Sequence, residues 1–75
     1  MNVEWSYEIH DDKMAFDPKT NAKIEMAHTK EQRTVQISLL GDEFVIDLKA
    51  ETGLGQRNNE RITLSRKVKG AEEGN

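Results

Sequence analysis

The segment TVQISLLGDEFVIDLK, residues 34–49, constrains the fold more than any other part of the chain. Apolar and polar residues alternate on both sides of Gly41, as they do in two strands that each bury one face. Glycine supplies the positive φ that a two-residue turn needs, so we predict a β-hairpin that turns at Gly41-Asp42. A slip of one residue would expose the whole apolar set, and the register should therefore be well determined. The expected apolar pairs are Leu39 with Phe44, Ile37 with Ile46, and Val35 with Leu48.

A second alternating segment, VEWSYEI at residues 3–9, precedes this hairpin. Its large apolar and aromatic residues fall on every other position, which predicts a strand with one buried face. HDDK at residues 10–13 is typical of a turn, because aspartate side chains bond to their own backbone there. KMAF at residues 13–16 is apolar enough to form the returning strand. We therefore expect a second hairpin at residues 3–16.

The residues that follow this hairpin have the pattern of a helix. Pro18 cannot donate to a β-ladder, and Thr20 or Asn21 can cap a helix start. Ile24, Ala27 and His28 then share one face, so we predict a short helix near residues 20–30. Its apolar stripe is narrow, and it needs tertiary packing to be stable.

The last third of the chain is divided between a loop and a strand. AETGLGQRNNE at residues 50–60 is rich in glycine and polar residues, and we interpret TGLGQR within it as a flexible turn. RITLSRKVK at residues 61–69 resumes the alternation and predicts a final strand. Short connections make the strands antiparallel, and only one sheet face is apolar. The predicted fold class is α+β, with about six strands curved around one helix.

Composition limits the function classes further. Seventy-five residues suffice for one small domain, which we place at residues 1–69, with a disordered tail at 70–75. The chain has no cysteine, which excludes disulfides and thiolate zinc sites. A net charge of -3 argues against a general nucleic-acid binder. No apolar run reaches the roughly 20 residues of a membrane span, and the first residues do not resemble a signal peptide, so we expect an intracellular protein of the nucleus or cytoplasm.

Candidate catalytic and metal-binding residues are few. Glu25 and His28 are three residues apart on the predicted helix, as in some bundle metal sites, but no second helix is expected to supply further ligands. We interpret His28 as a half-buried residue that fills the helix face. His10 lies beside two aspartates and can at most bind an ion weakly. No serine, carboxylate or histidine stands in a recognisable catalytic pattern, and we predict no enzymatic activity, cofactor or metal.

Basic residues gather on the final strand and its approach. Two interpretations remain open for them. Lysine and arginine commonly protect an exposed strand edge, so they can be a solvated edge. Alternatively, they form a rim that faces phosphate, since the arginine fork matches phosphate oxygens. The five residues are Arg57, Arg61, Arg66, Lys67 and Lys69.

Several short stretches, taken in order, resemble the WWE domain. They are Trp5 and Tyr7, AFD at 15–17, NAKIEMA at 21–27, FVIDL at 44–48 and RITLSR at 61–66. The resemblance covers nearly all of the chain before the tail. It implies a half-open antiparallel barrel around one helix, with Glu25 as the glutamate of the family name. We expect Glu25 to tie the helix to nearby backbone or to a basic partner.

The resemblance also implies a ligand pocket in the mouth of the half barrel, where several WWE domains bind iso-ADP-ribose, the repeating unit inside poly(ADP-ribose). Met14 stands where the family has a ligand-stacking tryptophan, and Phe44 replaces a tyrosine. Stacking on an aromatic is worth about 1–3 kcal/mol, and a lost bond to phosphate costs a similar amount, so two losses weaken binding roughly 100-fold. The residues carried over to this pocket are Tyr7, His10, Met14, Phe44, Gln56 and Arg61.

WWE domains occur in some ADP-ribosyltransferases and some ubiquitin ligases. The eroded pocket favours a non-catalytic, monomeric interaction module of a larger ADP-ribosyltransferase of the poly(ADP-ribose) polymerase family, such as a member that carries macrodomains. In this interpretation the module docks proteins or recognises ADP-ribose weakly. The alternative is a poly(ADP-ribose) reader domain of a ubiquitin ligase.

Overall fold

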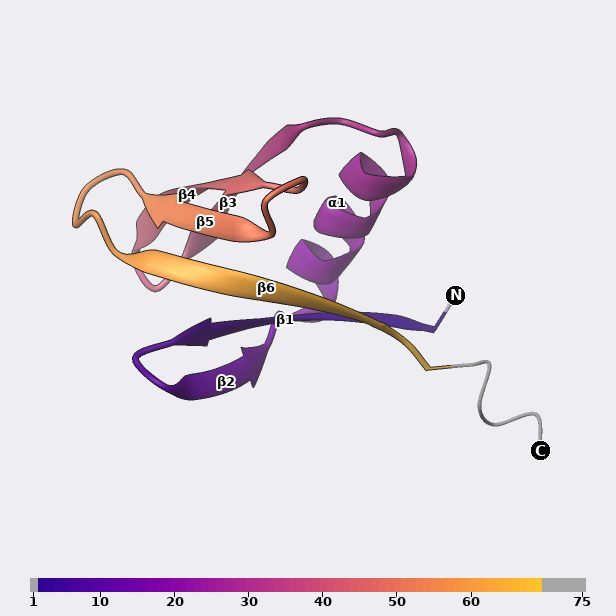
Figure 1. The fold of residues 1–75 in the computed structure, drawn as a ribbon, viewed down its shortest axis with the longest axis horizontal. Coiled ribbons are helices and arrows are strands. Elements are labelled where there is room, and N and C mark those ends of the chain that lie inside the picture. Colours follow the sequence, from indigo (N-terminus) through magenta and orange to yellow (C-terminus); the bar gives the residue numbers. More distant parts are fainter. Residues whose placement is uncertain (1, 70–75) are drawn as a thin grey trace.

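The computed structural model describes residues 2–69, which form one curved antiparallel sheet and one helix (Figure 1). The strand order is β2-β1-β6-β5-β4-β3, so β2 and β3 are the two edges of the sheet. This arrangement confirms the predicted α+β fold with a barrel that is not closed. The elements are β1 (Val3–Ile9), β2 (Asp12–Ala15), α1 (Pro18–Thr29), β3 (Thr34–Leu39), β4 (Asp42–Asp47), β5 (Thr52–Gly55) and β6 (Arg61–Val68).

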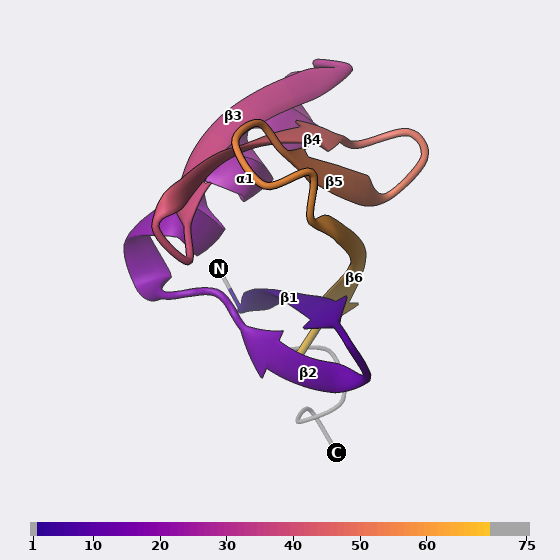
Figure 2. The ribbon, with the colours of Figure 1, turned by 90° about the vertical axis from the view of Figure 1, so that its left-hand side faces the viewer.

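The helix lies against the concave side of the sheet and contacts β1 and β3, which are far apart in the strand order (Figure 2). Its buried residues Ile24 and Ala27 meet the inward face of the strands, as the alternating patterns predict. Burial of these apolar side chains is the main stabilising term of such a domain. The buried apolar residues are Val3, Trp5, Tyr7, Phe16, Ile24, Ala27, Ile37, Phe44, Ile46, Ile62 and Leu64.

The first hairpin forms as predicted, but the helix starts earlier than expected. Asp17 is the N-cap, and its carboxylate accepts a hydrogen bond from the Thr20 amide at 3.3 Å. Pro18 then occupies the first turn, where its fixed φ suits a helix and its missing donor costs nothing. The prediction that Thr20 or Asn21 caps the helix is therefore wrong. The side chain of Asn21 bonds to β1 instead of capping its own helix.

The second hairpin turns one residue earlier than predicted. Leu40 and Gly41 form the turn with φ values of 54° and 76°. Asp42 belongs to β4 because its carboxylate is buried and bonded to backbone amides of another loop. The predicted pairs are wrong by two positions, although each residue keeps its predicted face. The observed pairs are Leu39 with Asp42, Ile37 with Phe44, and Val35 with Ile46.

The segment TGLGQR is not a flexible turn, because residues Thr52–Gly55 form β5 between β4 and β6. Gly53 is buried beneath two large side chains: a Cβ atom at this position would lie 2.7 Å from Ile46 Cδ1 and 2.8 Å from Ile62 Cγ1. The glycines that suggested a loop are thus required by close packing inside a strand.

The final strand is also not an edge. β6 pairs with β1 over residues Val3–Glu8 and with β5 over residues Thr52–Leu54. The interpretation of its basic residues as a solvated strand edge is therefore wrong. The predicted tail at 70–75 lies outside the described residues.

Replacement of Gly53 by alanine tests the packing of β5. The added methyl group would press on Ile46 and Ile62, which are both fully buried in the core. We expect Gly53→Ala to lower the free energy of unfolding by about 1–3 kcal/mol. Urea titration followed by Trp5 fluorescence measures this change. Ser65→Ala, an exposed position on β6, is the control and should change stability by less than about 0.5 kcal/mol; equal stability of the two variants would contradict the packing argument.

Candidate functional site

Three connections lie together at one end of the half barrel, which we call the mouth. They are the β1–β2 turn at residues 10–11, the β3–β4 turn at 40–41 and the β5–β6 loop at 56–60. Consecutive antiparallel strands reverse direction, so these alternate connections share one end of the sheet, on the left of Figure 1 and facing the viewer in Figure 2. The predicted ligand residues lie on or just behind these connections.

Tyr7 and Met14 are opposite each other in the β1–β2 ladder. The Tyr7 ring packs on Phe16, with centroids 4.8 Å apart, and is only 5 % exposed. Its hydroxyl donates to Met14 Sδ at 3.8 Å, while Met14 itself is 53 % exposed. The side chain open to solvent at this point is therefore a thioether, and the aromatic ring beside it is in the core.

His10 contacts Glu60, the residue that precedes Arg61. His10 Nε2 lies 3.0 Å from Glu60 Oε1, which joins the β1–β2 turn to the β5–β6 loop. Arg61 follows Glu60 directly and is exposed at the start of β6. A carboxylate thus lies against His10, one of the candidate ligand-binding residues.

Phe44 and Gln56 belong to the opposite wall of the half barrel. Phe44 is 1 % exposed and lies in the core. The Gln56 amide donates to Glu43 O at 2.8 Å, and its side chain bonds locally to Leu54 O. The structure therefore brings Tyr7 together with Met14, and His10 toward Arg61, but leaves Phe44 and Gln56 apart from them.

Asp42 is the residue of the mouth that sequence reasoning missed, because the pattern assigned it to a turn. Its carboxylate, 6 % exposed, accepts bonds from the backbone amides of Glu43 at 2.7 Å, Arg57 at 3.0 Å and Asn58 at 3.1 Å. Burial acts to raise the pKa of Asp42, but these three donors more than offset it and hold the pKa below its usual value. Asp42 therefore anchors the β5–β6 loop to β4. An aspartate directly after a turn glycine was the available signal.

Glu25 connects the helix to two strands. It accepts bonds from Trp5 Nε1 at 2.8 Å and, at both oxygens, from Arg66 Nε at 3.0 Å and Nη2 at 2.8 Å. The Arg66 bonds, which outweigh partial burial, and the Trp5 bond lower the pKa of Glu25 to about 2. The expectation of a basic partner for Glu25 is confirmed.

His28 differs from its predicted role, since it is exposed rather than half-buried. Its ring meets the edge of Trp5 at a centroid distance of 5.5 Å, so it covers the indole from outside. Within residues 2–69, no group of three histidine or carboxylate side chains is arranged to hold a metal ion. Glu25 and His28 are therefore explained by the packing around Trp5.

The basic residues of β6 and its approach do not form one rim. Arg66 pairs with Glu25, and Lys69 lies 3.8 Å from Glu4. Arg57 donates to Gly41 O at 3.4 Å at the mouth. The structure thus distributes these cations over both ends of the half barrel, with Arg57 and Arg61 at the mouth.

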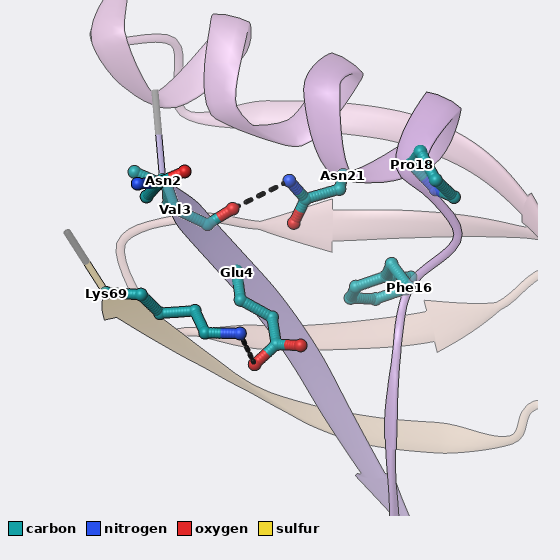
Figure 3. A pocket seen from close by; sticks show the side chains of 7 residues that line it. All are labelled: Asn2, Val3, Glu4, Phe16, Pro18, Asn21 and Lys69. Atoms are coloured by element: carbon teal, nitrogen blue, oxygen red, sulfur yellow. Dashed lines mark hydrogen bonds and ion pairs between the residues drawn. The ribbon is translucent and has the colours of Figure 1, made fainter.

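A hollow of about 280 Å³ lies at the end opposite the mouth (Figure 3). Asn21 reaches into it from α1: its Nδ2 donates to Val3 O at 2.9 Å, and its Oδ1 accepts from the Trp5 amide at 2.6 Å. These are the two bonds that one residue of a parallel strand would make, so the Asn21 amide takes the place of a missing strand beside β1. The helix α1 and strand β1, which line this hollow, are thus hydrogen-bonded to each other.

Comparison with known families agrees with this geometry. The sequence matches the family model of the WWE domain over residues 3–69, and the chain belongs to this family. WWE domains are, in general, non-catalytic modules that bind proteins or poly(ADP-ribose). No curated protein matches the chain. Among the described residues, no helix is long and apolar enough to cross a membrane.

The Glu25 junction predicts a pH dependence of stability. The pKa of Glu25 is lowered from 4.5 to about 2 in the folded chain, so the unfolded chain binds the proton more strongly. The stabilisation is therefore complete above pH 4.5 and is lost as the pH falls toward 2, and it amounts to about 3 kcal/mol at most. Urea titrations at several pH values between 2.5 and 6 give the free energy of unfolding at each pH. This free energy should change less steeply with pH for Glu25→Gln than for the wild type.

The control for this measurement is Glu8→Gln, which removes an exposed carboxylate from β1. We expect this variant to retain the wild-type slope between pH 2.5 and 6. An unchanged slope in Glu25→Gln would show that the junction contributes nothing to acid sensitivity.

Proposed function

We propose that this WWE domain is a protein-docking module of a larger intracellular protein linked to ADP-ribosylation, and that its mouth recognises ADP-ribose only weakly. The observation that carries the proposal is the state of the mouth. Tyr7 and Phe44 are in the core, the exposed side chain is Met14, and the imidazole of His10 lies against a carboxylate.

Each of these features opposes a phosphorylated ligand. A base or ribose needs an exposed aromatic face to stack on, and a thioether offers only part of that interaction. A phosphate that approaches His10 must first displace Glu60, whose negative charge also repels it. Burial of a charged ligand without compensating bonds is unfavourable, so affinity should fall well below that of an intact pocket.

We propose an ADP-ribosyltransferase as the parent protein, because a docking role does not require an intact pocket. The second candidate is a poly(ADP-ribose) reader in a ubiquitin ligase. Arg61 favours this candidate, since it is exposed at the start of β6, next to the mouth, and an arginine fork matches phosphate oxygens. Ligand titration separates the two.

Titration of iso-ADP-ribose into ¹⁵N-labelled domain tests the proposal. We expect amide shifts that are small, not saturated at about 1 mM ligand, and restricted to the mouth around Tyr7, His10 and Arg61. Saturation at micromolar ligand would overturn the docking proposal in favour of the reader.

A gain-of-function pair tests why the mouth binds weakly. Met14→Trp restores an exposed aromatic face, and Glu60→Gln removes the carboxylate from His10. We expect each change to strengthen iso-ADP-ribose binding about tenfold, because each restores an interaction of about 1–2 kcal/mol. Glu8→Gln, which removes an equal charge from an exposed position on β1, is the control for Glu60→Gln and should leave the affinity unchanged. No gain from either variant would show that other features of the mouth prevent binding.

A further inference from the structure

The two edges of the sheet are protected very differently. β2 has four residues and carries Asp12 and Lys13, so it is short and charged, as protected edges usually are. β3 has six residues, TVQISL, without a charged residue, a proline or a break in its register. An edge of this kind can accept another strand.

The alternation of hydrogen bonds along the β3–β4 ladder shows which backbone groups of β3 face outward. The Leu48 amide donates to Arg33 O at 2.8 Å, so residue 33 forms a bonded pair with β4. Bonded and non-bonded pairs alternate in antiparallel ladders, so the backbone groups of Thr34, Gln36 and Ser38 point away from β4. All three residues are exposed, and no hydrogen bond from residues 2–69 reaches their outward backbone groups.

The helix α1 makes different contacts with its two neighbouring strands, β1 and β3. Beside β1, the Asn21 amide occupies the outward groups of Val3 and Trp5. Beside β3, α1 offers no such amide. Instead, two hollows of about 250 and 170 Å³ follow the line between α1 and β3 and share Lys23 as a common wall. We call these two hollows together the α1–β3 groove.

A stripe of exposed side chains on α1 and its C-cap residue borders this groove. Its members are four, three and four residues apart, which places them on one helix face. The three ammonium groups of the stripe form no ion pair within the described residues. Lys23 lines the same hollow as Ile37 and Ser38, which places it beside β3. The stripe consists of Lys19, Lys23, Met26 and Lys30.

We infer that the α1–β3 groove binds an extended acidic peptide of a partner protein, which adds a strand to β3. The peptide backbone pairs with Thr34, Gln36 and Ser38, and its acidic side chains meet the lysines of the stripe. The charge of the stripe, opposite to the net charge of the chain, selects an acidic partner. This inference rests on the proposed docking function and assigns it a surface separate from the mouth.

The probe for this surface is a nine-residue peptide that alternates glutamate and valine, with blocked termini. It is titrated into the ¹⁵N-labelled domain beside the matching lysine–valine peptide. We expect saturable shifts at residues 34–38 and along the stripe with the acidic peptide only. The acidic peptide N-methylated at alternate residues loses one row of donors and should bind at least about tenfold more weakly.

Two charge-reversal variants with equal net charge complete the test. Lys19→Glu/Lys23→Glu/Lys30→Glu should weaken the acidic peptide about tenfold or more and allow the lysine–valine peptide to bind. The matched control Lys13→Glu/Lys49→Glu/Lys67→Glu changes the same charge elsewhere and should retain binding. Gln36→Pro removes one outward donor without breaking the bonds to β4, and it should also prevent binding.

Several outcomes would overturn the inference. One is that the control triple variant loses as much acidic-peptide binding as the stripe variant, and another is that the N-methylated peptide binds as tightly as the unmethylated one. The others are amide shifts confined to the mouth, or no shift at about 1 mM peptide. Concentration-dependent pairing of β3 with a second copy, or iso-ADP-ribose shifts along the stripe, would assign the groove to another ligand. These results leave the docking function itself untouched, since that function fails only through tight iso-ADP-ribose binding at the mouth.

Discussion

The bonds of Glu25 hold the half barrel together. One carboxylate on α1 accepts hydrogen bonds from the indole of Trp5 on β1 and from the guanidinium of Arg66 on β6. Trp5 is the largest fully buried side chain among the described residues. A buried indole needs an acceptor, and a partly buried guanidinium needs a charge, so one residue satisfies both requirements. Because the helix is short and only weakly amphipathic, its position on the sheet depends on this junction and on Asn21 rather than on helix propensity.

Much of the fold follows from alternation in the sequence. The inward faces of β1, β3, β4 and β6 were predictable because a residue that points to the core remains in phase even when a strand slips by two positions. The basic partner of Glu25 was also predictable, since a carboxylate on the buried side of a helix requires compensation. Within the candidate site, the pairing of Tyr7 with Met14 agrees with the predicted first hairpin.

The remaining features depend on contacts that no local pattern contains. Asp42 fixes the β3–β4 turn through amides of residues 57–58, fifteen positions away, so the turn could not be located from its own residues. Gly53 looks like a loop residue until Ile46 and Ile62 are known to close over it. The carboxylate that faces His10 belongs to Glu60, fifty residues later, and no spacing rule connects the two.

In this open barrel, α1 lies beside two stretches of strand that lack a β-partner on one side: the edge strand β3, and Val3–Trp5 of β1, which extends past the short edge strand β2. Beside β1, α1 supplies the Asn21 amide, which bonds to Val3 O and the Trp5 amide and so blocks this stretch to a partner strand. Beside β3, the same helix supplies lysines, which attract an acidic chain but cannot satisfy backbone groups. An edge that lacks a proline and a charge of its own, and that lies next to lysines without an ion pair among residues 2–69, is selective rather than blocked. The groups that hold the helix, Glu25 and Asn21, lie on other faces of α1 than the lysine stripe, so the groove can evolve or be mutated without loss of the fold.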